Sequence, residues 1–103
     1  MISLNSRSRI WLEDNGYASQ VVETGIPKTF KKRDLFGCFD VIAVGHGRVL
    51  FVQATSLSNA SSRRKKVLAN PIYEVIKDTD GGYMDLHLWF KKGRFWRLRI
   101  EEL

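Results

Sequence analysis

Apolar residues form two nearly continuous runs near the middle of the chain, with a short glycine-containing segment between them. The runs cover residues 38–44 and 49–55, and residues 45–48 read Gly-His-Gly-Arg. This pattern predicts a β-hairpin whose two-residue turn is His46-Gly47. Because both strands are apolar at almost every position, we expect a sheet that is covered on both faces.

Asp40 and Gln53 are polar residues inside these apolar runs. A two-residue turn at His46-Gly47 sets a register that places Asp40 directly opposite Gln53, and Cys38 opposite Thr55. Cross-strand partners share one face of a sheet, with Cβ atoms about 5 Å apart. The sequence therefore predicts that Asp40 and Gln53 lie side by side.

The remaining segments predict helices and strands around this hairpin. Asn15-Gly16 is a helix stop signal, and Asn70-Pro71 is typical of a cap and first helical position. In chain order we expect a helix over 5–15, a strand over 17–23, the two hairpin strands, a basic helix over 63–70, a short helix over 71–77, and a terminal hairpin of strands 83–90 and 95–100. This order indicates one α/β domain, with a mixed central sheet flanked by helices and a C-terminal β-hairpin.

The size of the chain fits a single domain, because 103 residues with 44% hydrophobic residues can bury one core. Lys and Arg outnumber Asp and Glu by 17 to 11, for a net charge of +6. Such an excess favours a polyanionic partner, with nucleic acid ahead of an anionic membrane.

The cysteine content and the amino terminus bear on the compartment. Cys38 is the single cysteine, so no internal disulfide can form and no cysteine cluster can hold zinc. Residues 1–9 contain two arginines and no sustained apolar run, which excludes a signal peptide or membrane span there. We expect a cytoplasmic protein with no membrane partner.

Asp40 and Gln53 both carry side-chain oxygens, which are the ligands that hard divalent cations prefer. Glu23, at the end of the preceding strand, supplies a second carboxylate if that strand lies beside the hairpin. Phosphodiester cleavage uses such a cation to activate water and to neutralise charge on the phosphate. The same residues can also be read as a buried polar pair, in which Gln53 satisfies Asp40 without a metal.

The order of these features resembles the PD-(D/E)XK nuclease superfamily over nearly the whole chain. The features are a helix, a strand ending in Glu23, Gly37-x-x-Asp40 before an apolar strand, Gln53-x-Thr55 and a basic helix. The chain resembles a group of small phage or prophage proteins of this superfamily, and its layout also resembles Holliday-junction resolvases and VRR-type nucleases. The residues that carry this similarity are Val22-Glu23, Arg33-Asp34-Leu35-Phe36-Gly37, Asp40 and Val52-Gln53-Ala54-Thr55-Ser56.

The resemblance implies a restriction-endonuclease-like αβββαβ core and a nuclease that depends on Mg²⁺ or Mn²⁺. It places the aspartate of the motif at Asp40, its acid or glutamine at Gln53, and an auxiliary acid at Glu23. The third catalytic position, usually lysine, is Thr55, whose hydroxyl cannot supply a cation to the attacked phosphate. Either Arg63 or Lys66 of the following helix would then supply that cation. Because Gln53 replaces an acid and Thr55 replaces the lysine, an alternative function also stays open. In it, the chain is a nuclease-like module that binds nucleic acid or a protein and has lost cleavage.

Basic residues are concentrated in two further segments. We expect them to contact the phosphates of nucleic acid, with DNA as the preferred partner, and a homodimer would grip a duplex more readily. The basic run 91–94 adds to these patches, although a soluble hairpin turn would explain it equally well. The residues predicted to bind nucleic acid are Lys28, Lys31, Lys32, Arg33, Arg63, Arg64, Lys65 and Lys66.

Overall fold

A mixed five-stranded sheet is the centre of the structure, a computed structural model that describes residues 2–22, 24–25 and 32–103. The predicted order of helices and strands is confirmed, and a pair of two-residue strands, β2 and β3, is added to it. The elements are α1 (Leu4–Asp14), β1 (Ala18–Val21), β2 (Thr24–Gly25), β3 (Lys32–Arg33), β4 (Val41–Gly45), β5 (Arg48–Ser56), the 3₁₀ helix η1 (Leu57–Asn59), α2 (Ala60–Ala69), α3 (Ile72–Lys77), β6 (Gly82–Lys92) and β7 (Phe95–Glu102).

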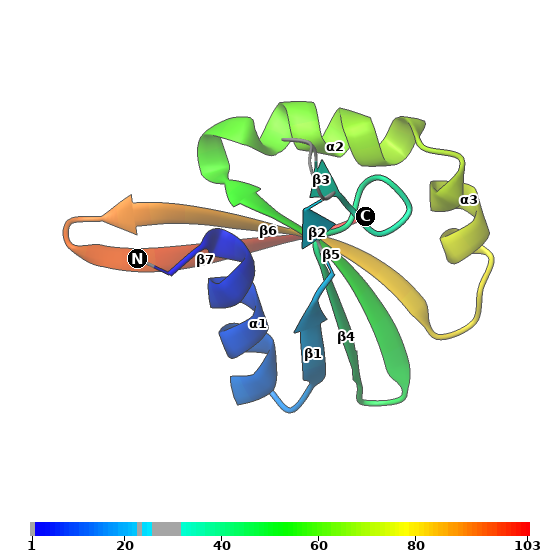
Figure 1. Ribbon diagram of the computed structural model, residues 1–103, viewed down its shortest axis with the longest axis horizontal. Coiled ribbons are helices and arrows are strands. Elements are labelled where there is room, and N and C mark those ends of the chain that lie inside the picture. Colours follow the sequence, from blue (N-terminus) through cyan, green and yellow to red (C-terminus); the bar gives the residue numbers. More distant parts are fainter. Residues whose placement is uncertain (1, 23, 26–31) are drawn as a thin grey trace.

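The strands of this sheet run in the order β1-β4-β5-β6-β7 (Figure 1). Only β5 and β6 are parallel, and the other neighbours are antiparallel. A parallel pair needs a crossover connection, and η1, α2 and α3 provide it. The sheet is therefore mixed and flanked by helices, with a C-terminal hairpin, as the sequence predicts.

The β4–β5 hairpin has the register that the sequence predicts. Gly45 pairs with Arg48, and Val41 pairs with Val52. His46 and Gly47 both have positive φ, at 54° and 75°. Two-residue turns of this kind match the right-handed twist of the strands, which is why the turn sets the register.

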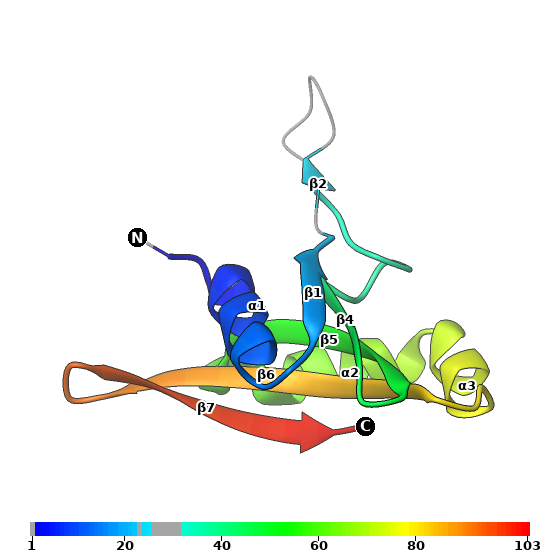
Figure 2. The same cartoon turned by 90° about the horizontal axis from the view of Figure 1, so that it is seen from below.

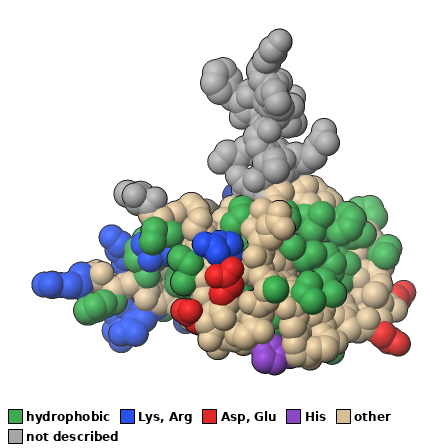
Figure 3. Space-filling view, turned by 60° about the horizontal axis from the view of Figure 1, so that its bottom comes forward, with side chains coloured by type: hydrophobic (Ala, Val, Ile, Leu, Met, Phe, Trp, Pro, Cys, Tyr) green, Lys and Arg blue, Asp and Glu red, His purple; other side chains and the backbone are tan. Residues whose placement is uncertain are grey.

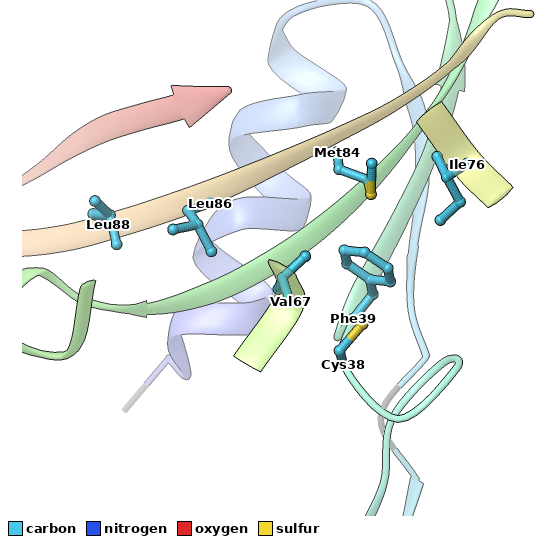
Figure 4. Close-up of a cluster of buried hydrophobic side chains, with 7 residues drawn as sticks. All are labelled: Cys38, Phe39, Val67, Ile76, Met84, Leu86 and Leu88. Carbon is cyan, nitrogen blue, oxygen red and sulfur yellow. The ribbon is translucent and has the colours of Figure 1, made fainter. Parts of the chain in front are cut away.

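Helices cover both faces of the sheet, as the apolar hairpin strands require. On one face, α1 packs through Leu12 against Val41, Ala43, Leu50 and Val52, all 2% exposed or less. The other face packs against α2 and α3 (Figure 4). The buried residues there are Cys38, Phe39, Val67, Ile76, Met84, Leu86 and Leu88.

Several element boundaries differ from the predicted ones for reasons of pairing. Strand β1 ends at Val21, two residues before Glu23, because its partner strand β4 begins at Val41. Strands β6 and β7 are longer than predicted. Strand β5 pairs with β6 from Gly82 onward, and β6 and β7 pair with each other as far as Lys92 and Glu102. The basic helix begins at Ala60, where η1 leads directly into it. Asn70 caps α3 as predicted, since its Oδ1 accepts a hydrogen bond from the Ile72 N–H at 3.0 Å.

Two hairpin-like parts extend from the body of the molecule. Strand β2 stands well away from the central sheet, and the turn between β6 and β7 projects beyond the helices (Figures 1 and 2). Lys and Arg side chains gather around the β6–β7 turn (Figure 3). Among the described residues, no helix combines the length and the apolar character that crossing a membrane demands.

Candidate functional site

A pocket of about 220 Å³ lies where α1, α2, β5 and the loop before β4 meet. Strand β5 continues past the end of β4, since their pairing stops at Val41 and Val52. The part of β5 beyond this point borders the pocket. Its lining residues are Ser3, Leu4, Asn5, Asp34, Asp40, Gln53, Ala54 and Arg63.

Asp40 and Gln53 lie side by side in this pocket, which confirms the prediction from the hairpin register. Their side chains are 4% and 3% exposed, and Gln53 Nε2 donates a hydrogen bond to Asp40 Oδ2 at 2.5 Å. The amide orientation follows from this hydrogen bond. It leaves Gln53 Oε1 buried, with no hydrogen-bond donor among the described residues.

Asp34 is a second carboxylate in the pocket, and no sequence pattern predicted it as a site residue. The loop that follows it turns back on itself, with positive φ at Phe36 (55°) and Gly37 (76°), and Leu35 forms a β-bridge with Phe39. This turn brings Asp34 and Asp40 to the same pocket. The glycine at position 37 was the one local signal of such a turn.

Helix α2 supplies the positive charge of the site through two of the predicted residues. Arg63 lines the pocket, and its Nε is buried with no acceptor among the described residues. Lys66 Nζ forms a salt bridge with Asp34 Oδ2 at 3.3 Å. Arg63 and Lys66, the alternative sources of a catalytic cation expected from the sequence, therefore lie at or beside the pocket.

Cys38 lies close to the same charges but is unsuited to nucleophilic chemistry. Burial raises the pKa of its thiol to about 11; Lys66 lowers this pKa, and Asp34 and Asp40 raise it. A thiol with such a pKa is protonated at neutral pH. Cys38 therefore serves the core, where it is completely buried.

The other predicted residues of this region lie outside the pocket lining. Thr55 is buried, and its Oγ1 accepts a hydrogen bond from Asn59 Nδ2 at 3.4 Å. Arg64 pairs with Glu101 of β7, with Nη2 to Oε1 at 2.6 Å, and Lys65 is exposed to solvent. The basic run of α2 thus contains one residue that lines the pocket (Arg63), two ion-paired residues (Arg64 and Lys66) and one surface residue (Lys65).

The structure does not describe the side chains of five residues that were predicted to bind a metal or nucleic acid. Glu23, Lys28 and Lys31 lie outside the described residues. The backbone of Lys32 and Arg33 forms β3, which pairs with β2. The predicted roles of these five residues stay predictions.

The amino-terminal end of α1 adds a further positive contribution to the pocket. Ser3 caps this helix through a hydrogen bond from the Ser6 N–H to Ser3 Oγ at 3.1 Å, and Ser3, Leu4 and Asn5 line the pocket. The free N–H groups of a first helical turn carry a partial positive charge. The pocket thus combines carboxylates with groups that favour an anion.

The metal-binding capacity of the pocket depends on two carboxylates and one amide. No group of three or more His, Cys, Asp or Glu side chains is placed to hold a metal ion in the described part of the chain. Gln53 turns Nε2 toward Asp40, so its Oε1 becomes a third oxygen ligand beside Asp34 and Asp40 only when the amide is reversed. This set of oxygens fits Mg²⁺ or Mn²⁺, which retain several water ligands, and does not fit a closed structural zinc site.

Comparisons with protein-family models, with curated proteins and with solved structures give no match for this chain.

Proposed function

We propose that this protein is a metal-dependent nuclease that cleaves phosphodiester bonds in DNA, on a restriction-endonuclease-like αβββαβ core of the PD-(D/E)XK type. One observation carries the proposal. Two buried polar atoms that lack partners among the described residues, Gln53 Oε1 and Arg63 Nε, belong to residues of the same pocket. Leaving buried polar atoms unsatisfied costs free energy, which a ligand with both a cation and an anionic oxygen would recover.

A divalent cation and a phosphate together have this character. Asp34, Asp40 and Gln53 would hold Mg²⁺ or Mn²⁺, with Glu23 as an expected auxiliary acid. When bound, the cation supplies Lewis acidity and lowers the pKa of a water molecule. The protein contributes the carboxylates that hold this charge in place.

Arg63 has the role of binding an oxygen of the phosphate, since its guanidinium is a fixed donor beside the carboxylates. Lys66 keeps a positive charge at Asp34, 3.3 Å from its Oδ2. The first turn of α1 lines the same pocket, and the partial positive charge of a helix N-terminus favours the negative phosphate. Together, Arg63, Lys66 and the first turn of α1 would provide the positive charge that Thr55 cannot supply.

A second function is supported by the partners that the carboxylates already have. Asp40 accepts from Gln53, and Asp34 pairs with Lys66. Such pairing stabilises the two acids without a metal, and Gln53 is neutral where an acid would hold a cation more tightly. A nuclease-like module that binds nucleic acid without cleaving it would use the same fold.

Cleavage assays with the purified full chain separate the two functions. Duplex, single-stranded and branched DNA would be incubated with Mg²⁺, with Mn²⁺ and with EDTA. For a nuclease, we expect cleavage with either metal, loss of cleavage in Asp40→Asn, and unchanged cleavage in Asp78→Asn, which lies at the exposed end of α3. Binding without cleavage under every metal would establish the second function. Cleavage that survives Asp40→Asn would overturn the proposed site.

A further inference from the structure

The end of the β6–β7 hairpin carries a concentrated positive charge that none of the pocket residues accounts for. We define the basic arm as residues 91–99. No Asp or Glu occurs between Asp85 and Glu101. The basic arm contains five exposed cations, which are Lys91, Lys92, Arg94, Arg97 and Arg99.

The charge of the basic arm is not neutralised within the described part of the protein. None of its five cations forms a salt bridge to a described carboxylate, whereas Arg64 pairs with Glu101 and Lys66 pairs with Asp34. The basic run of α2 is therefore partly neutralised, although its four consecutive cations stand out in the sequence more than those of the basic arm do. On the face shown in Figure 3, Lys and Arg side chains gather at the hairpin end of the molecule.

An aromatic side chain holds two cations together at the base of the basic arm. The Arg7 guanidinium lies 4.7 Å from the centroid of the Trp96 ring, and Lys91 Nζ lies 5.4 Å from it. Both cations therefore contact one aromatic ring, and an anion bound nearby would interact favourably with each of them. Arg7 belongs to α1, whose first turn lines the pocket, so positive charge extends from the pocket toward the basic arm.

The register of β6 sets the distance between the basic arm and the pocket. Leu86 pairs with Gln53, and Lys92 lies six residues farther along the same strand. At about 3.3 Å per residue, this separation is roughly 20 Å. Bases along one strand of DNA are about 3.4 Å apart, so the separation corresponds to about six base pairs.

We propose that the basic arm binds the phosphate backbone of duplex DNA about six base pairs to one side of the pocket. The position relative to the cleaved bond rests on the proposed function; the binding itself does not. Exposed Lys and Arg contact phosphates without reading bases, so the arm supplies affinity and orientation rather than sequence specificity. A two-stranded β-ribbon also has a width that a DNA groove can accept.

The first experiment measures affinity without cleavage. Binding of a labelled duplex of about 20 base pairs would be followed by fluorescence anisotropy in EDTA over a range of salt concentrations. The double variant Arg94→Gln/Arg97→Gln should bind about tenfold more weakly, and its salt slope should fall by about 2. The control Arg9→Gln/Lys77→Gln removes the same charge from α1 and α3 and should bind as the unchanged protein does.

The outcomes of this experiment decide the assignment. Equal weakening of DNA binding in both double variants would indicate a general effect of net charge and would overturn the assignment of binding to the basic arm. Unchanged binding in both double variants would also overturn it. Arg94→Lys/Arg97→Lys keeps the charge and should restore most of the affinity. Equally tight binding of poly-glutamate would overturn the assignment to nucleic acid.

A second experiment tests the position and separates the two proposals. Neutral methylphosphonate groups placed about six base pairs from the cleaved bond should weaken binding of the unchanged protein, with no further weakening in the arm variant. Additive losses would overturn the position. Weakened binding in the arm variant without any metal-dependent cleavage would remove the proposed function and keep the arm. Metal-dependent cleavage together with unchanged affinity in the arm variant would keep the proposed function and overturn the role of the arm.

Discussion

Gln53 and Asp40 are joined across the β4–β5 hairpin by a hydrogen bond from Nε2 to Oδ2 of 2.5 Å, and both side chains are almost fully buried. The carboxylate is thereby satisfied by a neutral donor, while the other end of the amide keeps an unused acceptor. A cation held by both residues requires the amide oxygen to face the carboxylate. If the proposed cation is held here, the strength of its binding should therefore depend on the residue at position 53.

Replacing Gln53 by Glu should strengthen cation binding and weaken the metal-free fold. A second carboxylate adds ligand charge, which should raise the affinity for Mg²⁺ or Mn²⁺ about tenfold. Without metal, two buried carboxylates would repel, and we expect a loss of on the order of 2 kcal/mol in the free energy of unfolding. Titration calorimetry and urea unfolding would measure the two effects.

The control for this substitution is Gln20→Glu, because Gln20 is exposed on β1. It should change neither the cation affinity nor the stability appreciably. Equal cation affinities for Gln53→Glu and the unchanged protein would contradict direct ligation by residue 53.

Removing Lys66 should affect turnover far more than DNA binding. Its ammonium lies 3.3 Å from Asp34 Oδ2, beside the pocket, so Lys66→Ala removes positive charge where the transition state needs it. We expect kcat to fall about a hundredfold, and the affinity for duplex DNA to change by less than about threefold. Arg63→Ala should behave similarly, since Arg63 lines the pocket.

Single-turnover cleavage and anisotropy would measure these two quantities separately. Lys77→Ala, at an exposed position of α3, is the control for the loss of one lysine. Parallel losses of turnover and binding in Lys66→Ala would assign this residue to binding alone.

Two buried titratable groups on β6 should give opposite dependences of stability on pH. Burial raises the pKa of Asp85 from 3.8 to about 6; Glu102 raises it further and Arg48 lowers it. The folded state holds this proton more tightly than the unfolded state, so stability present below pH 4 is lost as the pH rises to about 6. Burial lowers the pKa of His87 from 6.5 to about 4, so stability is lost as the pH falls through this range.

Each of these contributions is about 3 kcal/mol, and they should nearly cancel between pH 4 and 6. Asp85→Asn removes the first and leaves the second. Its free energy of unfolding should therefore rise by about 3 kcal/mol from pH 4 to 6.5, while that of the unchanged protein stays nearly level. Urea unfolding at several pH values is the measurement. Parallel pH profiles for the two proteins would contradict this assignment.

Ser8→Ala should destabilise the contact between α1 and the sheet. Ser8 is fully buried, and its Oγ accepts a hydrogen bond from Trp89 Nε1 at 2.9 Å and lies 2.9 Å from His87 Nδ1. The substitution leaves two buried ring nitrogens without this partner, so we expect a loss of about 2–4 kcal/mol in the free energy of unfolding. Ser61→Ala, at an exposed position of α2, should change it by less than about 0.5 kcal/mol.

The sequence by itself determined the β4–β5 hairpin and the pairing of Asp40 with Gln53. Both follow from local physics, because a two-residue turn sets the register and the period of two assigns each side chain to a face. The order of the helices and strands followed from similarly local signals, such as the Asn70 cap. The short β2–β3 pair had no such signal and was missed.

The tertiary structure decided which charges meet. Lys66 and Asp34 are 32 residues apart in the chain, and Arg64 and Glu101 are 37 apart. Neither pair has a fixed spacing that a pattern could reveal, since the position of α2 over the sheet in the folded chain creates both. This tertiary packing brought Asp34 into the pocket, paired Arg64 with Glu101 and left the cations of the β6–β7 hairpin exposed. The free energy of an ion pair depends on distance and burial in the folded chain, and neither is a local property of the sequence.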